Sequence, residues 1–154
     1  MKDIQIKKID SDKAPLELLL LADPSREAIG RYLKKGNCFA AYRGNDVVGM
    51  YVAILRNPSV AEIINIAVAE NHQNKGIGKL LVSDAIKRMK KTSVKRLLVG
   101  TGNSSISQLA FYQKCGFRIA RIKKDYFIKN YKKAIYENGI QCRDMIMLEL
   151  AILD

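Results

Sequence analysis

The chain has 154 residues, of which 48% are hydrophobic and 27% charged, and its formal net charge is +12. This balance is typical of a globular protein and excludes a disordered or fibrous one. A chain of this length can bury roughly 70% of the surface that its unfolded form exposes, so we expect a single domain over residues 1–154. The high positive charge indicates either an anionic ligand or a solvated basic surface.

The sequence contains no segment that predicts secretion or membrane insertion. Its start, MKDIQIKKIDSD, lacks the apolar stretch of a signal peptide, and the apolar run at 16–22 is too short to span a bilayer. We therefore expect a cytoplasmic protein with no membrane partner. The three cysteines Cys38, Cys115 and Cys142 are an odd number and lack the spacing of metal ligands, so a disulfide framework or a metal site is not expected. They are expected to be reduced and packed, without a bound metal.

The predicted elements alternate between strands and helices. In chain order they are a strand (3–9), two helical segments (10–22, with cap residues and Pro15 at the start of its helix, and 23–36), a hairpin (37–43 and 47–55), a strand (60–69), a helix (76–89), a strand (95–102), a helix (104–116) and two strands (117–124 and 142–153). The strand over 60–69 is apolar on both faces and is expected at the centre of the sheet. Residues 125–141 predict part helix and part loop, with a turn at ENG. This order indicates an α/β protein with a mixed sheet flanked by helices.

A polar turn with two glycines joins the central strand to the helix after it. Gln73, Gly76 and Gly78 lie in this turn. A P-loop is excluded because no Ser or Thr follows the GK pair, and a dinucleotide fingerprint is excluded because position 81 is a leucine. Glycines let a ligand approach the backbone, and the first N–H groups of a helix favour an anion such as phosphate or pyrophosphate. The alternative is a tight turn in which the glycines only relieve strain.

The same residues resemble a motif of a known family. Gln73, Gly76 and Gly78 fit Q/R-x-x-G-x-G/A, the acetyl-CoA pyrophosphate motif of the GNAT family of N-acetyltransferases, and AFYQKCGF at 110–117 resembles that family's tyrosine helix and following strand. The resemblance covers most of the chain and is strongest over 61–122. It implies the acyl-CoA N-acyltransferase (GNAT) fold, with a central mixed, mostly antiparallel sheet. It also implies direct acetyl transfer from acetyl-CoA to a primary amine of a small molecule or peptide.

The resemblance assigns a cofactor-binding role to a set of residues around this turn. They are Ile66, Ala67, Val68, Gln73, Asn74, Lys75, Gly76, Ile77, Gly78, Lys79, Asn103 and Ser105. The acetyl carbonyl is expected near the backbone N–H of Ile66, where a donor can stabilise an oxyanion. Many relatives have an asparagine seven residues before the tyrosine. That position is Ser105 here, so Ser105 or Asn103 contacts the cofactor, or the segment caps the next helix.

Two residues are candidates for acid and base. Glu62 lies where some family members carry a catalytic glutamate, which implies a base that acts directly or through water. The alternatives are a solvated carboxylate or one that binds the substrate's positive charge. Tyr112 matches the tyrosine that faces the CoA sulfur, and an ordinary phenol with a pKa of about 10 can protonate a thiolate. The alternative is a core aromatic, as expected for Phe111, while His72, the only histidine, is expected at the surface.

The acceptor is not determined by the sequence. Residues 125–144 carry aromatic and acidic side chains that suit an ammonium-bearing substrate, a packed cover or a dimer surface. They are Asp125, Tyr126, Phe127, Tyr131, Tyr136, Glu137 and Asp144. Cys115 is disfavoured as an acetyl carrier because the end of a helix does not favour a thiolate.

Three further hypotheses concern partners. A non-catalytic acyl-CoA-binding sensor or interaction module would keep the glycine turn but would not need Glu62 or Tyr112. Six of the ten residues over 87–96 are Lys or Arg, but no aromatic side chains lie among them to stack on bases, so no specific nucleic-acid partner is expected. Family members often pair through edge strands and C-terminal elements, which leaves a homodimer open.

Overall fold

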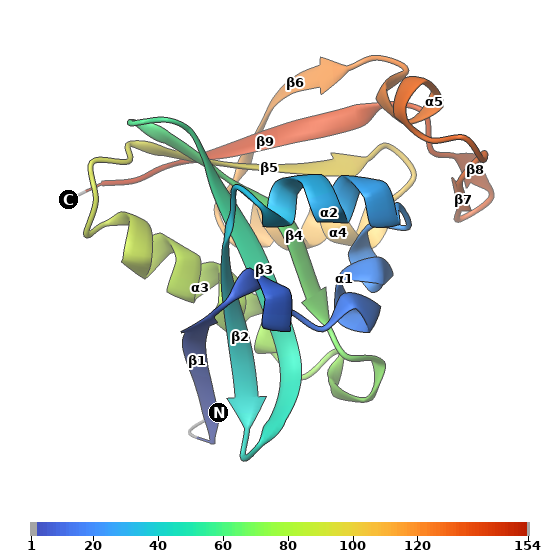
Figure 1. Ribbon diagram of the computed structural model, residues 1–154. Helices are drawn as coiled ribbons and strands as arrows, with labels where there is room; N and C mark the ends of the chain where they lie inside the picture. The colour runs from blue at the N-terminus through green and yellow to red at the C-terminus, as the bar shows by residue number, and fades with distance from the viewer. Residues whose placement is uncertain (1–2, 154) are drawn as a thin grey trace.

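The computed structural model describes residues 3–153, and its elements follow the predicted order (Figure 1). The strands are β1 (Ile4–Ile9), β2 (Asn37–Arg43), β3 (Asp46–Asn57), β4 (Val60–Val68), β5 (Arg96–Gly102), β6 (Arg118–Lys123), β7 (Tyr136–Glu137), β8 (Ile140–Gln141) and β9 (Met145–Ala151). The α-helices are α1 (Leu16–Ala22), α2 (Arg26–Leu33), α3 (Ile77–Met89), α4 (Ile106–Lys114) and α5 (Tyr126–Asn130), with short 3-10 helices at Ser11–Lys13 (η1) and Glu70–His72 (η2). Within residues 3–153, none of the helices has the length and apolar character needed to cross a membrane.

Seven strands form one sheet in the order β1-β2-β3-β4-β5-β9-β6. Strands β4 and β5 are parallel, and the other neighbouring pairs are antiparallel. The predicted mixed, mostly antiparallel sheet is therefore confirmed. Strand β4 is the middle strand of the seven, as its two apolar faces predicted, because both faces of a central strand are covered by helices.

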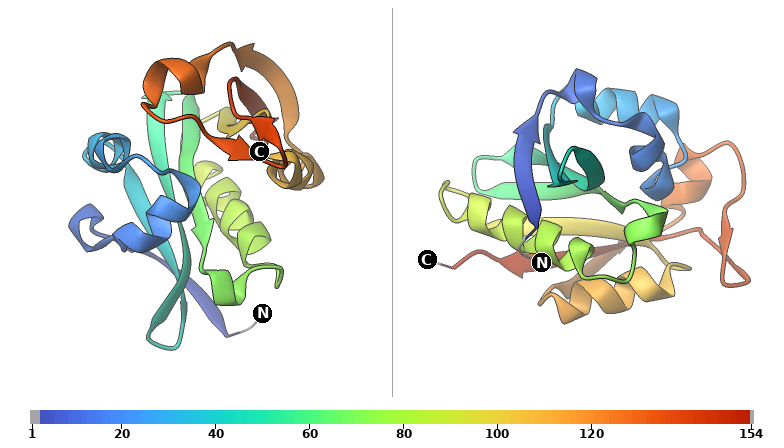
Figure 2. Two further views of the ribbon diagram at one scale, coloured as in Figure 1. Left: turned by 90° about the vertical axis from the view of Figure 1, so that its right-hand side faces the viewer. Right: turned by 90° about the horizontal axis from the view of Figure 1, so that it is seen from below.

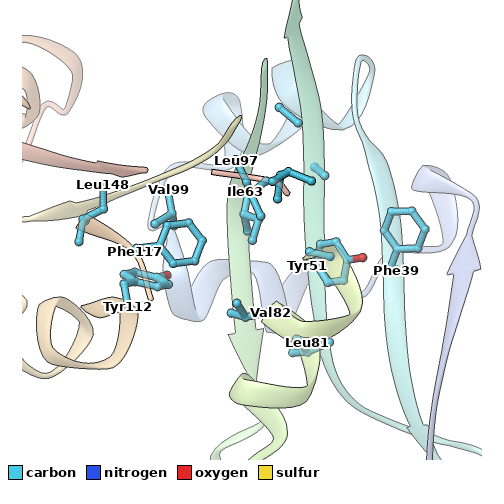
Figure 3. Close-up of a cluster of buried hydrophobic side chains, with 14 of the residues drawn as sticks. Phe39, Tyr51, Ile63, Leu81, Val82, Leu97, Val99, Tyr112, Phe117 and Leu148 are labelled. Atoms are coloured by element: carbon cyan, nitrogen blue, oxygen red, sulfur yellow. The ribbon is translucent and has the colours of Figure 1, made fainter. Parts of the chain in front are cut away.

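Two pairs of helices cover the two faces of this sheet (Figure 2). Helices α1 and α2 pack on one face, where Leu19 and Ile29 contact Met50 of β3. Helices α3 and α4 pack on the other face, where Leu81 lies in one cluster with Tyr51 (Figure 3). Met50 and Tyr51 are adjacent in sequence and fully buried on opposite faces, because successive side chains of a strand point to opposite sides.

The first helix begins where the sequence predicted. Residues 10–22 predicted cap residues and a helix with Pro15 at its start, and the chain forms the 3-10 turn η1 and then α1, which begins directly after Pro15. Proline has no N–H to donate and disfavours helical backbone in the residue before it, so the helix starts after it. Helix α2 begins after Ser25, whose hydroxyl accepts a hydrogen bond from the N–H of Ala28 at 3.1 Å.

The segment after β6 is part helix and part loop, as predicted. It contains α5 and a short hairpin of β7 and β8, which the sequence did not predict. The hairpin turns at Asn138 and Gly139, whose φ values of 55° and 71° are typical of a tight two-residue turn. Strand β9 starts at Met145 rather than at 142, because the N–H groups of Arg143 and Asp144 donate to the side chain of Asn103.

Candidate active site

The two parallel strands at the centre of the sheet separate along their length. Strand β4 pairs with β5 only over Val60–Ile63 and Arg96–Val99, although both strands continue beyond this point. On its other edge β4 shifts register against β3 at Ile64, which is an extra residue between two paired ones. A bulge of this kind bends a strand and increases its twist. The backbone at the end of β4 is therefore left open toward β5.

A cleft of about 440 Å³ lies beside this open end of β4. It is lined by Leu21, Ala22, Ile66, Ala67, Val68, His72, Gln73, Asn74, Gly76, Ile77, Gly78, Lys79, Ser107, Gln108 and Phe111. The structure thus brings together every residue predicted to bind the cofactor except Lys75, Asn103 and Ser105. The lining residues come from β4, the glycine turn with the start of α3, the first two turns of α4, and the end of α1.

The glycine turn presents free backbone donors to this cleft. Asn74 and Gly76 have φ values of 62° and 87°, so the chain turns sharply before α3 begins. The first bond within the helix runs from the N–H of Leu80 to the carbonyl oxygen of Gly76 at 3.1 Å. The N–H groups of the three residues between them have no partner in the helix, and no side chain caps this end among the described residues. Such donors favour a bound anion.

Gln73 and Gly78 shape the turn in different ways. The Gln73 side chain donates from Nε2 to the carbonyl oxygen of Val68 at 3.0 Å, which ties the turn to the end of β4. A Cβ atom at position 78 would lie 3.3 Å from Cζ of Phe111. Glycine therefore lets α3 and α4 approach each other closely. Phe111 packs against the core, as predicted, and also lines the cleft.

The sequence missed several residues of the cleft. His72 was expected at the surface, but it is half-buried and lines the cleft. Its Nδ1 atom is buried and has no hydrogen-bond partner within residues 3–153. Ser107 and Gln108 reach the cleft from the first turn of α4. The sequence indicated these two residues only through their position at the start of the helix that contains Tyr112.

Three residues predicted for the cofactor lie outside the cleft. Lys75 is exposed in the turn and is not part of the lining. Asn103 donates to the carbonyl oxygen of Gln141 at 3.1 Å and accepts from two backbone N–H groups of the segment before β9. The Ser105 hydroxyl donates to Glu137 at 2.7 Å and does not cap α4. The side chains of Asn103 and Ser105 thus hold the C-terminal segment.

Glu62 lies further back along β4 and lines a second cavity. It is 6% exposed. Both Nε and Nη2 of Arg56 approach its Oε1 atom to 2.9 Å, so the Oε2 atom stays available. The alternative of a solvated carboxylate is therefore wrong. The cavity has a volume of about 290 Å³. It is lined by Asp23, Ala28, Arg31, Tyr32, Lys35, Ile54, Arg56, Glu62, Ile63, Ile64, Gly100, Lys123, Tyr126, Tyr131 and Met145.

Asp23 organises the wall of this second cavity opposite β4. It accepts hydrogen bonds from the hydroxyls of Tyr32 at 3.2 Å and Tyr131 at 3.0 Å. Asn65 of β4 donates to the Tyr32 hydroxyl at 2.8 Å, which joins the network to the central strand. Burial raises the pKa of both phenols, and the charge of Asp23 raises it further. Both tyrosines therefore stay protonated and act as donors.

The acidic and aromatic segment contributes only part of its predicted residues to this cavity. Tyr126 and Tyr131 line it, and Phe127 stacks on Tyr131 with the ring centroids 5.5 Å apart. Tyr136 lies in the β7–β8 hairpin and is 65% exposed. The Asp125 carboxylate pairs with Arg143 at 3.1 Å rather than facing the cavity. The acidic residues that do line it are Glu62 of β4 and Asp23 from between α1 and α2, both far from this segment in the sequence.

Tyr112 is a core residue of α4 and is not part of the cleft lining. It is 4% exposed, and its ring centroid lies 5.3 Å from that of Phe111 and 6.0 Å from that of Phe117. Figure 3 shows Tyr112 beside Phe117 in the buried cluster. Burial raises the pKa of its phenol above the ordinary value, and the thiol of Cys115 adds to this. The sequence-based expectation of an unperturbed phenol is therefore wrong. The group stays protonated and is a weaker acid than free tyrosine.

Cys115 caps the C-terminal end of α4 and is half-buried. Burial raises the pKa of its thiol, although the nearby charge of Lys79 opposes this effect. A thiol with a raised pKa is a poor nucleophile at neutral pH. Its surroundings therefore support the expectation that Cys115 is not an acetyl carrier.

Comparisons with known proteins agree with this geometry. The family model described as the acetyltransferase (GNAT) family matches residues 7–117. The uncharacterized N-acetyltransferase YvbK of Bacillus subtilis (strain 168) is 52% identical over 134 residues, which cover 87% of this chain and 86% of that protein. Two solved structures are similar over nearly their whole length. One is a GNAT family acetyltransferase from Elizabethkingia anophelis with acetyl-CoA bound, with a TM-score of 0.95 and 46% identity over 98% of this chain and 99% of the other.

The second solved structure is a Bacillus subtilis acetyltransferase in complex with CoA. It has a TM-score of 0.91 and 47% identity over 97% of this chain and 99% of the other. These matches confirm the predicted family and fold. The chain therefore belongs to the acetyltransferase (GNAT) family.

Proposed function

We propose that the protein transfers an acetyl group directly from acetyl-CoA in the cleft to an amine in the second cavity. As a GNAT protein it is an N-acetyltransferase with acetyl-CoA as its cosubstrate. The observation that carries the direct route is that one strand lines both cavities. Residues 62–64 of β4 face the second cavity and residues 66–68 face the cleft. Two neighbouring substrates can thus meet at a single strand, which brings the reacting atoms together.

The cleft suits the donor. A pyrophosphate would accept hydrogen bonds from the N–H groups of Ile77, Gly78 and Lys79 at the start of α3. The backbone of β4 beyond Ile63 has no strand partner on the β5 side, so it can bond to the amide groups of a pantetheine arm. The N–H of Ile66 is the donor proposed for the acetyl oxygen, where it would stabilise the oxyanion that forms during transfer.

Gly76→Ala is expected to weaken acetyl-CoA binding about tenfold or more. The φ of 87° at this position costs an alanine about 1–2 kcal/mol, and relaxing the turn would turn the N–H donors away from the anion. Gly44→Ala is the matched control. It lies in the β2–β3 turn with a φ of 61° and has open space around it, so it should lose similar stability and no affinity. Calorimetric titration would detect the difference, and equal affinity in both variants would contradict the role of the turn.

Glu62 is proposed as the base for the ammonium proton. Its Oε2 atom carries no contact from Arg56, so a water or the amine can bond there. Glu62 and Ile66 are four positions apart on the strand, which is about 13 Å of extended chain. A water between the carboxylate and the amine would span part of this distance. The proton would pass to the carboxylate as the nitrogen attacks the acetyl carbon.

Tyr112 is proposed as the acid that protonates the departing thiolate. Its helix supplies Ser107, Gln108 and Phe111 to the cleft wall. Burial raises the pKa of its phenol, so the proton is present at neutral pH. Its transfer to a thiolate, whose parent thiol has a pKa of about 8.5, is uphill and requires the two groups to be in contact.

Turnover of acetyl-CoA tests this function. Release of free thiol would be measured with a panel of amino acids, aminoalkyl phosphates, polyamines, aminoglycosides and peptides. At least one amine is expected to give thiol release and an N-acetylated product of matching mass. Binding of acetyl-CoA without turnover of any amine would instead favour the non-catalytic acyl-CoA sensor.

We also propose a cytoplasmic homodimer. Strand β6 is an edge strand, and its Ile119 and Ile122 are each 55% exposed. An edge of this kind can pair with a second copy. The cysteines Cys38, Cys115 and Cys142 are free thiols, which suits the reducing cytoplasm.

A further inference from the structure

The second cavity carries more positive than negative charge. Four cationic side chains and two carboxylates line it, which leaves a formal excess of two positive charges. The cationic residues are Arg31, Lys35, Arg56 and Lys123, and the acidic ones are Asp23 and Glu62. A cavity built to receive an acceptor with only positive charges would have the opposite balance.

Both carboxylates already have partners. The Oε1 atom of Glu62 accepts from two nitrogens of Arg56. Both oxygens of Asp23 accept hydrogen bonds, from the hydroxyls of Tyr32 and Tyr131 and from the N–H of Ser25 at 3.0 Å. One oxygen of Glu62 is the part of this acidic set that remains open to a substrate amine.

Three of the four cations have no acidic partner. Within residues 3–153, Arg31, Lys35 and Lys123 take part in none of the ion pairs. The ammonium group of Lys123 lies 5.6 Å from the centroid of the Tyr126 ring, which holds it at the cavity. Arg31 and Lys35 come from α2 and the residues just after it. The free cations thus come from two segments on either side of the cavity.

Tyr126 lines the cavity together with side chains of both charges. The pKa of its phenol is raised by burial and by the charges of Asp23 and Glu62, and lowered by those of Arg56 and Arg31. Groups of both signs are therefore close to one ring that lines the cavity. An acceptor that fills this space can meet both a carboxylate and free cations.

We infer that the acceptor is an amine that also carries an anionic group, a carboxylate or a phosphate. This inference rests on the proposed function. The amine would lie at the open oxygen of Glu62, next to the residues of β4 that lead to the cleft. The anionic group would lie among Arg31, Lys35 and Lys123, where charge-assisted hydrogen bonds are stronger than neutral ones. A polyamine would place a second positive charge in this basic region.

Pairs of amines that differ only in the anionic group test this inference. γ-Aminobutyrate would be compared with γ-aminobutyramide and putrescine, and O-phosphoethanolamine with ethanolamine. The anionic member of at least one pair is expected to have a kcat/KM about tenfold higher or more. The pair with the larger difference in kcat/KM shows whether the acceptor carries a carboxylate or a phosphate. The preference should decrease as salt is added, because the cations face solvent.

A triple variant tests whether these cations are responsible. Arg31→Gln with Lys35→Gln and Lys123→Gln should lower the kcat/KM of the anionic member about tenfold or more and so remove its preference over the neutral member. The matched control is Arg26→Gln with Lys34→Gln and Lys124→Gln, which changes the same types of residue at exposed positions outside the cavity. This control should keep the preference.

Two results would contradict different conclusions. A higher kcat/KM for the neutral or dicationic amine would overturn the anionic acceptor and leave acetyl transfer intact. Absence of thiol release with every amine would contradict the proposed function. In that case calorimetric titration of γ-aminobutyrate and O-phosphoethanolamine into the CoA-loaded protein still tests the cavity. Binding that is lost in the triple variant supports the inference, and equal or absent binding in both proteins overturns it.

Discussion

Replacement of Glu62 by glutamine is expected to lower kcat about 10²-fold or more, with little change in the KM for acetyl-CoA. The amide keeps the size of the side chain but cannot take up the amine proton. The change leaves Arg56 without its partner, but the Arg56 side chain is 45% exposed and can be solvated by water. The variant should therefore fold. Thiol release measured over a range of pH should also show a flatter increase toward basic pH than in the wild type.

Glu149→Gln is the matched control for this substitution. Glu149 lies in β9 and pairs with Arg96 at 2.7 Å, so it is also a strand glutamate bonded to an arginine. It lines neither cavity. Its kcat and pH dependence should match those of the wild type. If Glu62→Gln also retains the wild-type dependence of rate on pH, the base is another group.

Replacement of Tyr112 by phenylalanine is expected to lower kcat well over tenfold, with little change in the KM for acetyl-CoA. The substitution removes only the hydroxyl, so the packing against Phe111 and Phe117 is kept. The raised pKa of the phenol also sets a pH dependence. An acid must be protonated to act, and a raised pKa extends its protonated range toward higher pH. The wild-type kcat should therefore show no decrease from ionisation of this group as the pH approaches about 10.

Tyr51→Phe separates a catalytic role from a general effect of losing a buried hydroxyl. Tyr51 is fully buried in the same cluster, and its hydroxyl donates to Asp84 at 2.8 Å. Its loss should lower the free energy of unfolding by about 1 kcal/mol and leave kcat unchanged. Equal kcat values for Tyr112→Phe and the wild type in steady-state assays would show that Tyr112 is only a core residue.

The donor side of the site could be predicted well because it depends on neighbouring residues. The apolar run of β4, the glycine turn and the start of α3 are consecutive in the chain. Gly76 has the positive φ that its residue type suggested. The lining of the cleft includes most of the predicted residues for the same reason. Asn103 and Ser105 were predicted from their spacing to Tyr112 but do not line the cleft. Their side chains bond instead to residues 137–144, and no motif predicted where that segment packs.

The acceptor side could be predicted only in part. Glu62 and Tyr131 were identified from the sequence, but Asp23 and Tyr32 were not. Tyr131 reaches Asp23 across 108 positions of sequence. Such a contact depends on where α1, α2 and the segment after α5 pack at the end of the sheet. No local period or motif encodes that arrangement.

By itself, therefore, the sequence determined the family, the order of the elements and the glycine turn before α3, because strand and helix periods and glycine conformations are local properties of the backbone. Only the tertiary structure decided that β4 and β5 separate after Ile63, that Glu62 is buried against Arg56, and that Arg31, Lys35 and Lys123 share one cavity. These features arise when segments distant in sequence pack together. The charge of the acceptor cavity, and with it the inferred class of acceptor, depends on that packing.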